Sequence, residues 1–222
     1  MEVAGYTKTF SMDQGDMIGN DQTFQSLYNA PLTDGKRQGI CCGLSIIWLA
    51  RRMMFHDETA EQRKAAIYTG AGFIWGGKTQ DAHLAAGAAG ADIQAIAEQM
   101  WNEPLRAYVL RVARGAEAEF GSSPSALAGP VAGRVNGAGD YSLWNIGLSP
   151  AAGDCAHIVA SYTSHGTLGL GLFKSFYFFD PNMGEYKIDG GDIEDFTKKM
   201  LEAYANSFRR VRYVVTAQAE RG

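Results

Sequence analysis

Two adjacent cysteines stand at the start of a strongly helical stretch, in Gly39-Ile40-Cys41-Cys42-Gly43-Leu44. The N-terminus of a helix carries roughly half a positive charge and unpaired backbone N–H groups, so a thiolate there is favoured over the neutral thiol. The stretch therefore predicts a nucleophilic cysteine. Such a cysteine needs a base to hold it as thiolate and a third group to orient that base.

A histidine and an aspartate in the C-terminal third could fill these two roles. His157 opens a predicted strand, and Asp180 closes another one 180 − 157 = 23 residues later. Two strands joined by a loop of that length can lie side by side. We then expect Asp180 to accept a hydrogen bond from one ring nitrogen and leave the other facing Cys41. The alternatives are a structural histidine at a strand start and a turn-forming aspartate before proline.

In these residues the chain resembles the YopT/AvrPphB-type papain-like cysteine peptidases of bacterial effectors. Three segments in matching order carry the resemblance over residues 37–217: Gly-x-Cys-x-Gly-Leu-Ser around Cys41, Ala-His-x-x-Ala at His157 and Phe-Asp-Pro-Asn-x-Gly-Glu at Asp180. The resemblance implies that Cys41 is the nucleophile, His157 the base and Asp180 the orienting acid. It also implies an α+β, papain-like fold, with an N-terminal helical part whose nucleophile helix packs on a C-terminal antiparallel β-sheet.

The adjacent thiols are distinguished by register. The family's cysteine stands one residue before a small-residue–Leu pair, and Gly43-Leu44 leaves Cys41 in that place. An oxyanion hole would combine the backbone N–H of Cys41 with a side-chain donor shortly upstream. Gln38 is the candidate, at a separation shorter than in papain. Cys155 is expected in the core.

No cofactor or metal is expected. His157, His165 and Cys155 lack the usual Cys-x-x-Cys or His-x-x-x-His spacing of ligand pairs. His56 and His83 are expected to be surface residues on helices. The glycine-rich run at 166–171 has no following Lys-Ser/Thr, so it predicts a hairpin tip and not a phosphate loop.

The composition limits the class of protein. A chain of 222 residues with 46% hydrophobic content can form one domain, and its net charge of 20 − 24 = −4 gives no general attraction to nucleic acid. Three cysteines argue against a disulfide framework and favour a reducing compartment. The first fifteen residues lack the pattern of a secretory signal, and no apolar run has the roughly 20 residues of a membrane span.

The expected order of elements is helices first and sheet second. Residues 1–35 are treated as an N-terminal arm or leader and 36–222 as the protease domain. Helices are expected at 42–55, at 59–68 after a capping box, at 79–101 up to a stop at Pro104, and from Asp192; a break at Gly70–Gly77; a loop at 115–139; and strands at 141–148, 157–163, 174–179, 185–188 and 210–216.

The resemblance implies a cysteine protease of a secreted bacterial effector or toxin, which reaches the target-cell cytoplasm without a signal peptide and cleaves a protein of the target or host cell. An immunity or chaperone protein is a candidate partner, and the arm before residue 36 would serve delivery or self-processing. Two alternatives stay open. The same triad could serve a deamidase or transglutaminase-like toxin, or the fold could be a binding module without turnover.

Overall fold

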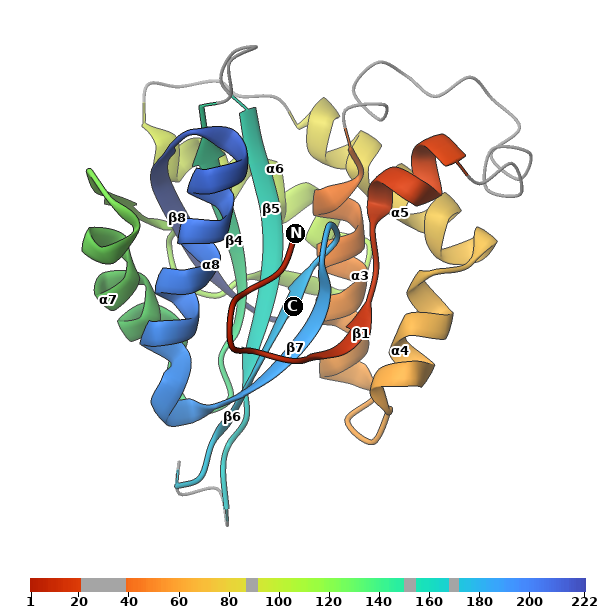
Figure 1. Cartoon of the computed structure of the whole chain (residues 1–222). Coiled ribbons are helices and arrows are strands. Elements are labelled where there is room, and N and C mark those ends of the chain that lie inside the picture. The colour runs from red at the N-terminus through yellow and green to blue at the C-terminus, as the bar shows by residue number, and fades with distance from the viewer. Residues whose placement is uncertain (21–38, 87–91, 150–154, 168–171) are drawn as a thin grey trace.

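The computed structural model describes residues 1–20, 39–86, 92–149, 155–167 and 172–222. Within these ranges, one antiparallel sheet of eight strands stands between two layers of helices (Figure 1). This confirms the expected α+β class. None of the helices in these ranges is long and apolar enough to cross a membrane.

The sheet follows the order β1-β7-β6-β5-β4-β8-β2, and β3 also pairs with β8. The strands predicted in the C-terminal third are confirmed to within a few residues, except that β8 runs on to Arg221. The bounds are Lys8–Ser11 (β1), Leu110–Val112 (β2), Glu117–Phe120 (β3), Tyr141–Leu148 (β4), Cys155–Thr163 (β5), Ser175–Asp180 (β6), Gly184–Asp189 (β7) and Val211–Arg221 (β8).

The two helical layers cover opposite faces of this sheet. Neighbouring residues of a strand point to opposite faces, so each strand contributes side chains to two cores. Ile158 and Phe179 pack in one core with the first layer, whereas Val159 and Phe178 pack in a second core with the other. The first layer is α3 (Cys41–Met54), α4 (Ala60–Ile67), α5 (Gly70–Ala85) and α6 (Ile93–Arg106); the second is α7 (Pro124–Val135) and α8 (Ile193–Phe208).

The expected break at Gly70–Gly77 is wrong, because α5 runs through all of its glycines. Thr69 starts the helix by accepting a hydrogen bond from the Gly72 N–H. The glycines serve close packing. A Cβ placed on Gly43 of α3 would lie 1.9 Å from the carbonyl oxygen of Gly76 of α5. Small residues at this crossing therefore let α5 hold the cysteine helix at backbone distance.

Gly43→Ala should destabilise the protein by about 3 kcal/mol or more, because the added methyl must push α3 and α5 apart. The free energy of unfolding in urea measures this. Gly133→Ala is the matched control: Gly133 lies in α7, is exposed, and its added methyl would meet no other atom within 4 Å. It should be neutral or stabilise by up to about 1 kcal/mol. Equal effects of the two changes would contradict the packing role.

The expected stop at Pro104 is also wrong, because α6 continues to Arg106. Proline has no N–H, so the carbonyl of Met100, four residues earlier, loses its helical donor. His83 of α5 takes this place, with its Nδ1 3.0 Å from the Met100 oxygen. His83 is therefore buried against α6 and is not the surface residue expected from the sequence.

The expected loop at 115–139 contains β3 and α7. Ser123 caps α7 by accepting a hydrogen bond from the Ala126 N–H, and Pro124 occupies the first helical position. Proline is well suited there because its missing N–H would have no helical partner and its φ is already helical. The glycine content of the segment concealed this start signal.

The described part of the N-terminal segment packs on the rest of the chain. β1 pairs with β7, and a short π-helix follows at Asp16–Asn20. The Tyr6 hydroxyl donates to the Asp195 carboxylate of α8 at 2.8 Å. That residues 1–35 act as an arm or leader stays a prediction, and residues 21–38 lie outside the described residues.

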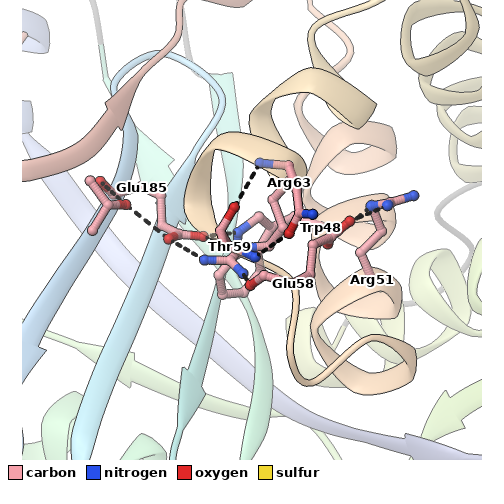
Figure 2. Close-up of polar contacts among 8 residues, drawn as sticks. Trp48, Arg51, Glu58, Thr59, Arg63 and Glu185 are labelled. Carbon is pink, nitrogen blue, oxygen red and sulfur yellow. Dashed lines mark hydrogen bonds and ion pairs between the residues drawn. The ribbon is translucent and has the colours of Figure 1, made fainter.

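A buried carboxylate ties α3, α4 and β1 to β7 (Figure 2). Glu185 has no exposed surface, and it accepts hydrogen bonds from the Trp48 indole and from two nitrogens of Arg63, each at 2.7 Å. Thr9 of β1 adds a fourth bond at 2.8 Å. The third Arg63 nitrogen donates to the Glu58 carbonyl. Both oxygens of the carboxylate are thus satisfied, which a buried ion requires.

Glu185→Gln should lower the free energy of unfolding by about 3–5 kcal/mol, because it leaves the Arg63 charge buried without its counter-ion. Thermal or urea unfolding measures the loss. Glu202→Gln is the control, since Glu202 makes an exposed 4.0 Å pair with Lys198 on α8. That change should cost less than about 1 kcal/mol. A loss for Glu185→Gln no larger than the control's would show that the network does not hold α3.

Candidate active site

Cys41 is the first residue of α3, and the neighbouring Cys42 is placed differently. The Cys41 side chain is partly exposed and lines a cleft of about 380 Å³, whereas Cys42 is fully buried in the core. Burial and the neighbouring Cys41 raise the pKa of the Cys42 thiol well above its ordinary value. Cys42 therefore stays a neutral core thiol, and Cys41 is the one presented to the cleft.

His157 of β5 stands between Cys41 and Asp180. Its Nε2 lies 2.9 Å from Oδ1 of Asp180, the last residue of β6. The ring lines the same cleft as Cys41, and its proximity lowers the pKa of the Cys41 thiol. With Nε2 engaged by the carboxylate, Nδ1 is the nitrogen left for sulfur. The Ser45 hydroxyl of α3 donates to the Ile158 carbonyl at 3.0 Å and fixes the cysteine helix on the strand that carries His157.

Asp180 is fixed by more than its histidine. The Asn182 N–H donates to Oδ1 at 2.7 Å, and the buried Tyr204 hydroxyl of α8 donates to Oδ2. Burial and then the charge of Asp180 raise the pKa of Tyr204 well above its ordinary value, so this hydroxyl keeps its proton as a donor. The Tyr204 ring also packs beside the imidazole, with 5.5 Å between ring centroids.

The arrangement favours a thiolate–imidazolium pair. Burial raises the pKa of Cys41, but the hydrogen bond and charge of His157, with backbone hydrogen bonds from Ile158 and Cys42, outweigh it, and the pKa lies below its ordinary value. Burial lowers the pKa of His157, whereas the charge and hydrogen bond of Asp180, and then Cys41, raise it to about 10. Between these two pKa values the site holds a thiolate beside a protonated base.

The first three backbone N–H groups of α3 differ in their hydrogen-bond partners. Gln80 of α5 accepts the N–H groups of Cys42 and Gly43 through its Oε1, at 3.1 and 3.3 Å. The Cys41 N–H, at the first helical position, has no acceptor within its own helix. It is therefore the backbone donor best placed for an oxyanion. The side-chain candidate Gln38 lies outside the described residues.

Cys155 is not the core residue expected from the sequence. It is exposed at the start of β5 and lines the same cleft as Cys41 and His157. It stands two residues before His157, and alternate residues of a strand share a face, so the two side chains point to the same side of the sheet. Any thiol measurement on Cys41 must therefore control for Cys155.

Sequence reasoning missed several neighbours of the site. Tyr204 belongs to the apolar stripe of α8, where a buried tyrosine signals an acceptor for its hydroxyl. Asn182 and Glu185 belong to the Phe-Asp-Pro-Asn-x-Gly-Glu segment at Asp180, but the sequence did not predict which residues they contact. Gln14 and Gln80 carry no signal, because their roles arise only when distant elements pack together. No group of three metal-binding side chains occurs within the ranges that the structure covers.

The fold and the site together define a papain-like α+β protein, with a cysteine helix packed on an antiparallel sheet that carries a histidine and an aspartate. Among solved structures, the chain is similar to the Pseudomonas avirulence protein AvrPphB, with a TM-score of 0.68 and 22% identity over 88% of this chain and 98% of that chain. This likeness confirms the AvrPphB-type fold.

A second solved structure, PatoxP, is described as a cysteine protease-like domain of the Photorhabdus asymbiotica toxin PaTox. It aligns with a TM-score of 0.37 and 12% identity, over 90% of this chain and 57% of that chain. No family model matches the chain, and no curated protein matches it by sequence.

The ion pair predicts how stability depends on pH. Because the folded pKa of His157 is raised, its contribution is complete below about pH 6.5 and is lost as pH rises toward about 10. The lowered pKa of Cys41 acts in the opposite sense, with a contribution that is complete above the ordinary thiol pKa of about 8.5. Between the lowered pKa of Cys41 and about pH 8.5 the two slopes therefore have opposite signs in the wild type.

Cys41→Ser removes the contribution of the Cys41 thiol to the pH dependence of stability. Its free energy of unfolding should therefore fall with pH from 7 to 8.5, by up to about 1.4 kcal/mol per pH unit, while that of the wild type stays closer to level. Urea unfolding at several pH values measures both slopes. Parallel curves would show that the two groups do not form an ion pair.

Proposed function

We propose that the protein is a papain-like cysteine endopeptidase in which Cys41, His157 and Asp180 form the catalytic triad. The carrying observation is that Asp180 binds one nitrogen of His157, while the same ring lines the cleft beside the thiol at the start of α3 and lowers the pKa of that thiol. This is the relation that nucleophile, base and orienting acid require. No cofactor is needed for this chemistry.

In the proposed reaction, the Cys41 thiolate attacks the carbonyl carbon of a peptide bond. The Cys41 N–H, with Gln38 as the proposed side-chain donor, stabilises the oxyanion of the tetrahedral intermediate. The imidazolium of His157 gives its proton to the leaving amine as the C–N bond breaks, and a thioester remains. Water then attacks the thioester, His157 takes one water proton, and the carboxylic acid product and the thiolate are released.

The proposed setting is that of a secreted bacterial effector or toxin acting on a protein inside a target or host cell. The fold shared with the avirulence protein AvrPphB supports this proposal. Delivery would use a route without a signal peptide, and an immunity or chaperone protein would hold the enzyme inactive where it is made. The substrate would lie in the cleft lined by Cys41 and His157.

Terminal-fragment proteomics of target-cell lysate tests the proposed reaction. Wild-type protein should create new N-termini, whereas Cys41→Ala and His157→Ala should lose activity by at least about 10⁴-fold, since each removes a member of the triad. Cys155→Ser should keep activity, because the Cys155 thiol has no role in the proposed reaction.

The controls distinguish the remaining possibilities. Cys42→Ala should keep activity in the folded fraction, and loss there with an active Cys41→Ala would move the nucleophile by one residue. The intact mass of a modified target separates cleavage, which gives two fragments, from deamidation of a glutamine or asparagine. Unchanged activity in both Cys41→Ala and His157→Ala would overturn the proposed triad.

A further inference from the structure

One amide side chain from the N-terminal segment joins the two ends of the candidate site. Gln14 is buried, with 6% of its surface exposed. Its Oε1 accepts a hydrogen bond from the Ile40 N–H at 2.8 Å, and its Nε2 donates to Oδ1 of Asn182 at 2.7 Å. A single side chain therefore contacts both the turn before Cys41 and the loop after Asp180.

Both partners of Gln14 lie one step from the proposed triad. Ile40 is the residue that caps α3, directly before the nucleophile. Asn182 gives its backbone N–H to the Asp180 carboxylate at 2.7 Å. A shift of the Gln14 amide would thus move the sulfur and the carboxylate relative to each other, with His157 between them.

Backbone hydrogen bonds on one side and the Gly39 turn on the other hold the Gln14 side chain in place. After β1, the chain continues beside the 181–183 loop, with the Met12 N–H donating to the Met183 carbonyl at 3.4 Å and the Gln14 N–H to the Pro181 carbonyl at 2.8 Å. On the other side, Gly39 has a φ of +144°, which favours glycine, and a Cβ there would lie 3.4 Å from Gln14 Oε1. The turn and the amide fit each other.

The same segment also forms part of the cleft wall. The residues that line the cleft with Cys41 and His157 include four more from this segment: Asp13, Gly15, Ile18 and Gly19. Asp13 accepts a hydrogen bond from the Gly15 N–H at 2.8 Å, which fixes the turn next to Gln14. A substrate in the cleft would therefore touch the N-terminal segment as well as the nucleophile.

We propose that Gln14 is a positioning residue that couples the Cys41 turn to the Asp180 loop, and that residues 13–19 form part of the wall of the active site. Gln14 lies 41 − 14 = 27 residues before Cys41. The turn before Cys41 is therefore held in part by a residue that is distant in sequence. This inference rests on the proposed function. Gln14 acts through Ile40 and Asn182.

The test measures the rate of Cys41 alkylation by iodoacetamide against pH, in a Cys155→Ser background. Gln14→Met keeps the length of the side chain and removes both hydrogen bonds, so the thiol and imidazole should lose their alignment. We expect the apparent pKa of the thiol to rise by about one unit, which lowers the alkylation rate about tenfold at pH values well below that pKa. On a cleaved substrate, kcat should fall about 10- to 100-fold.

Tyr6→Phe is the matched control, because it removes the hydrogen bond of the same segment to Asp195, outside the cleft. It should keep the wild-type pH profile even if the melting temperature falls. If Gln14→Met does not fold, Asn182→Ala removes the hydrogen bond between Gln14 and Asn182 from its other end. This change should also raise the apparent pKa of the thiol.

The outcomes separate this inference from the proposed function. A folded Gln14→Met or Asn182→Ala protein with the wild-type alkylation profile would overturn the positioning role while the triad stands. A wild-type thiol that titrates near its ordinary pKa of about 8.5 would overturn the proposed triad itself. A raised pKa in both Gln14→Met and Asn182→Ala, with Tyr6→Phe unchanged, would support the inference.

Discussion

The fully buried Glu185 carboxylate is the interaction on which the arrangement of this protein depends. It gathers the Trp48 indole of the cysteine helix, the Arg63 guanidinium of α4 and the Thr9 hydroxyl of β1 at one point of β7 (Figure 2). Trp48 in turn stacks on Phe179, with 5.6 Å between centroids and 7° between planes, and Phe179 directly precedes Asp180. The cysteine helix is thereby set in register with the strand that ends in the acid.

Further contacts position the elements of the candidate site relative to one another. Gly43 and Gly76 let α5 approach α3 closely, and Gln80 of α5 then reaches the backbone donors at the start of α3. Tyr204 holds the carboxylate from the opposite helical layer. The proposed nucleophile, base and acid come from a helix and two strands far apart in sequence, so their geometry is a property of the whole fold.

The sequence was informative where chemistry depends on local context. Cys41 before a helix, His157 at a strand start and Asp180 before Pro181 were each predicted from their neighbours, and the strands from short runs rich in aromatic and β-branched residues between turn residues. The errors in the helix bounds have a common cause: glycine and proline were taken as breaks. At Gly76 glycine instead permits close packing against Gly43 of α3, and at Pro104 proline leaves a carbonyl for His83. Gln14 could not be predicted, since its partners are 26 and 168 residues away.

In the proposed site, His157 is protonated opposite a Cys41 thiolate at pH values between the lowered pKa of Cys41 and about 10. Nuclear magnetic resonance of protein labelled with ¹⁵N histidine tests it directly, because the chain has only four histidines and His157→Ala assigns the signal. The account predicts that both ring nitrogens of His157 stay protonated at pH 8 and that the ring titrates near pH 10. A His157 ring that is neutral at pH 8 and titrates near its ordinary value of about 6.5 would contradict it.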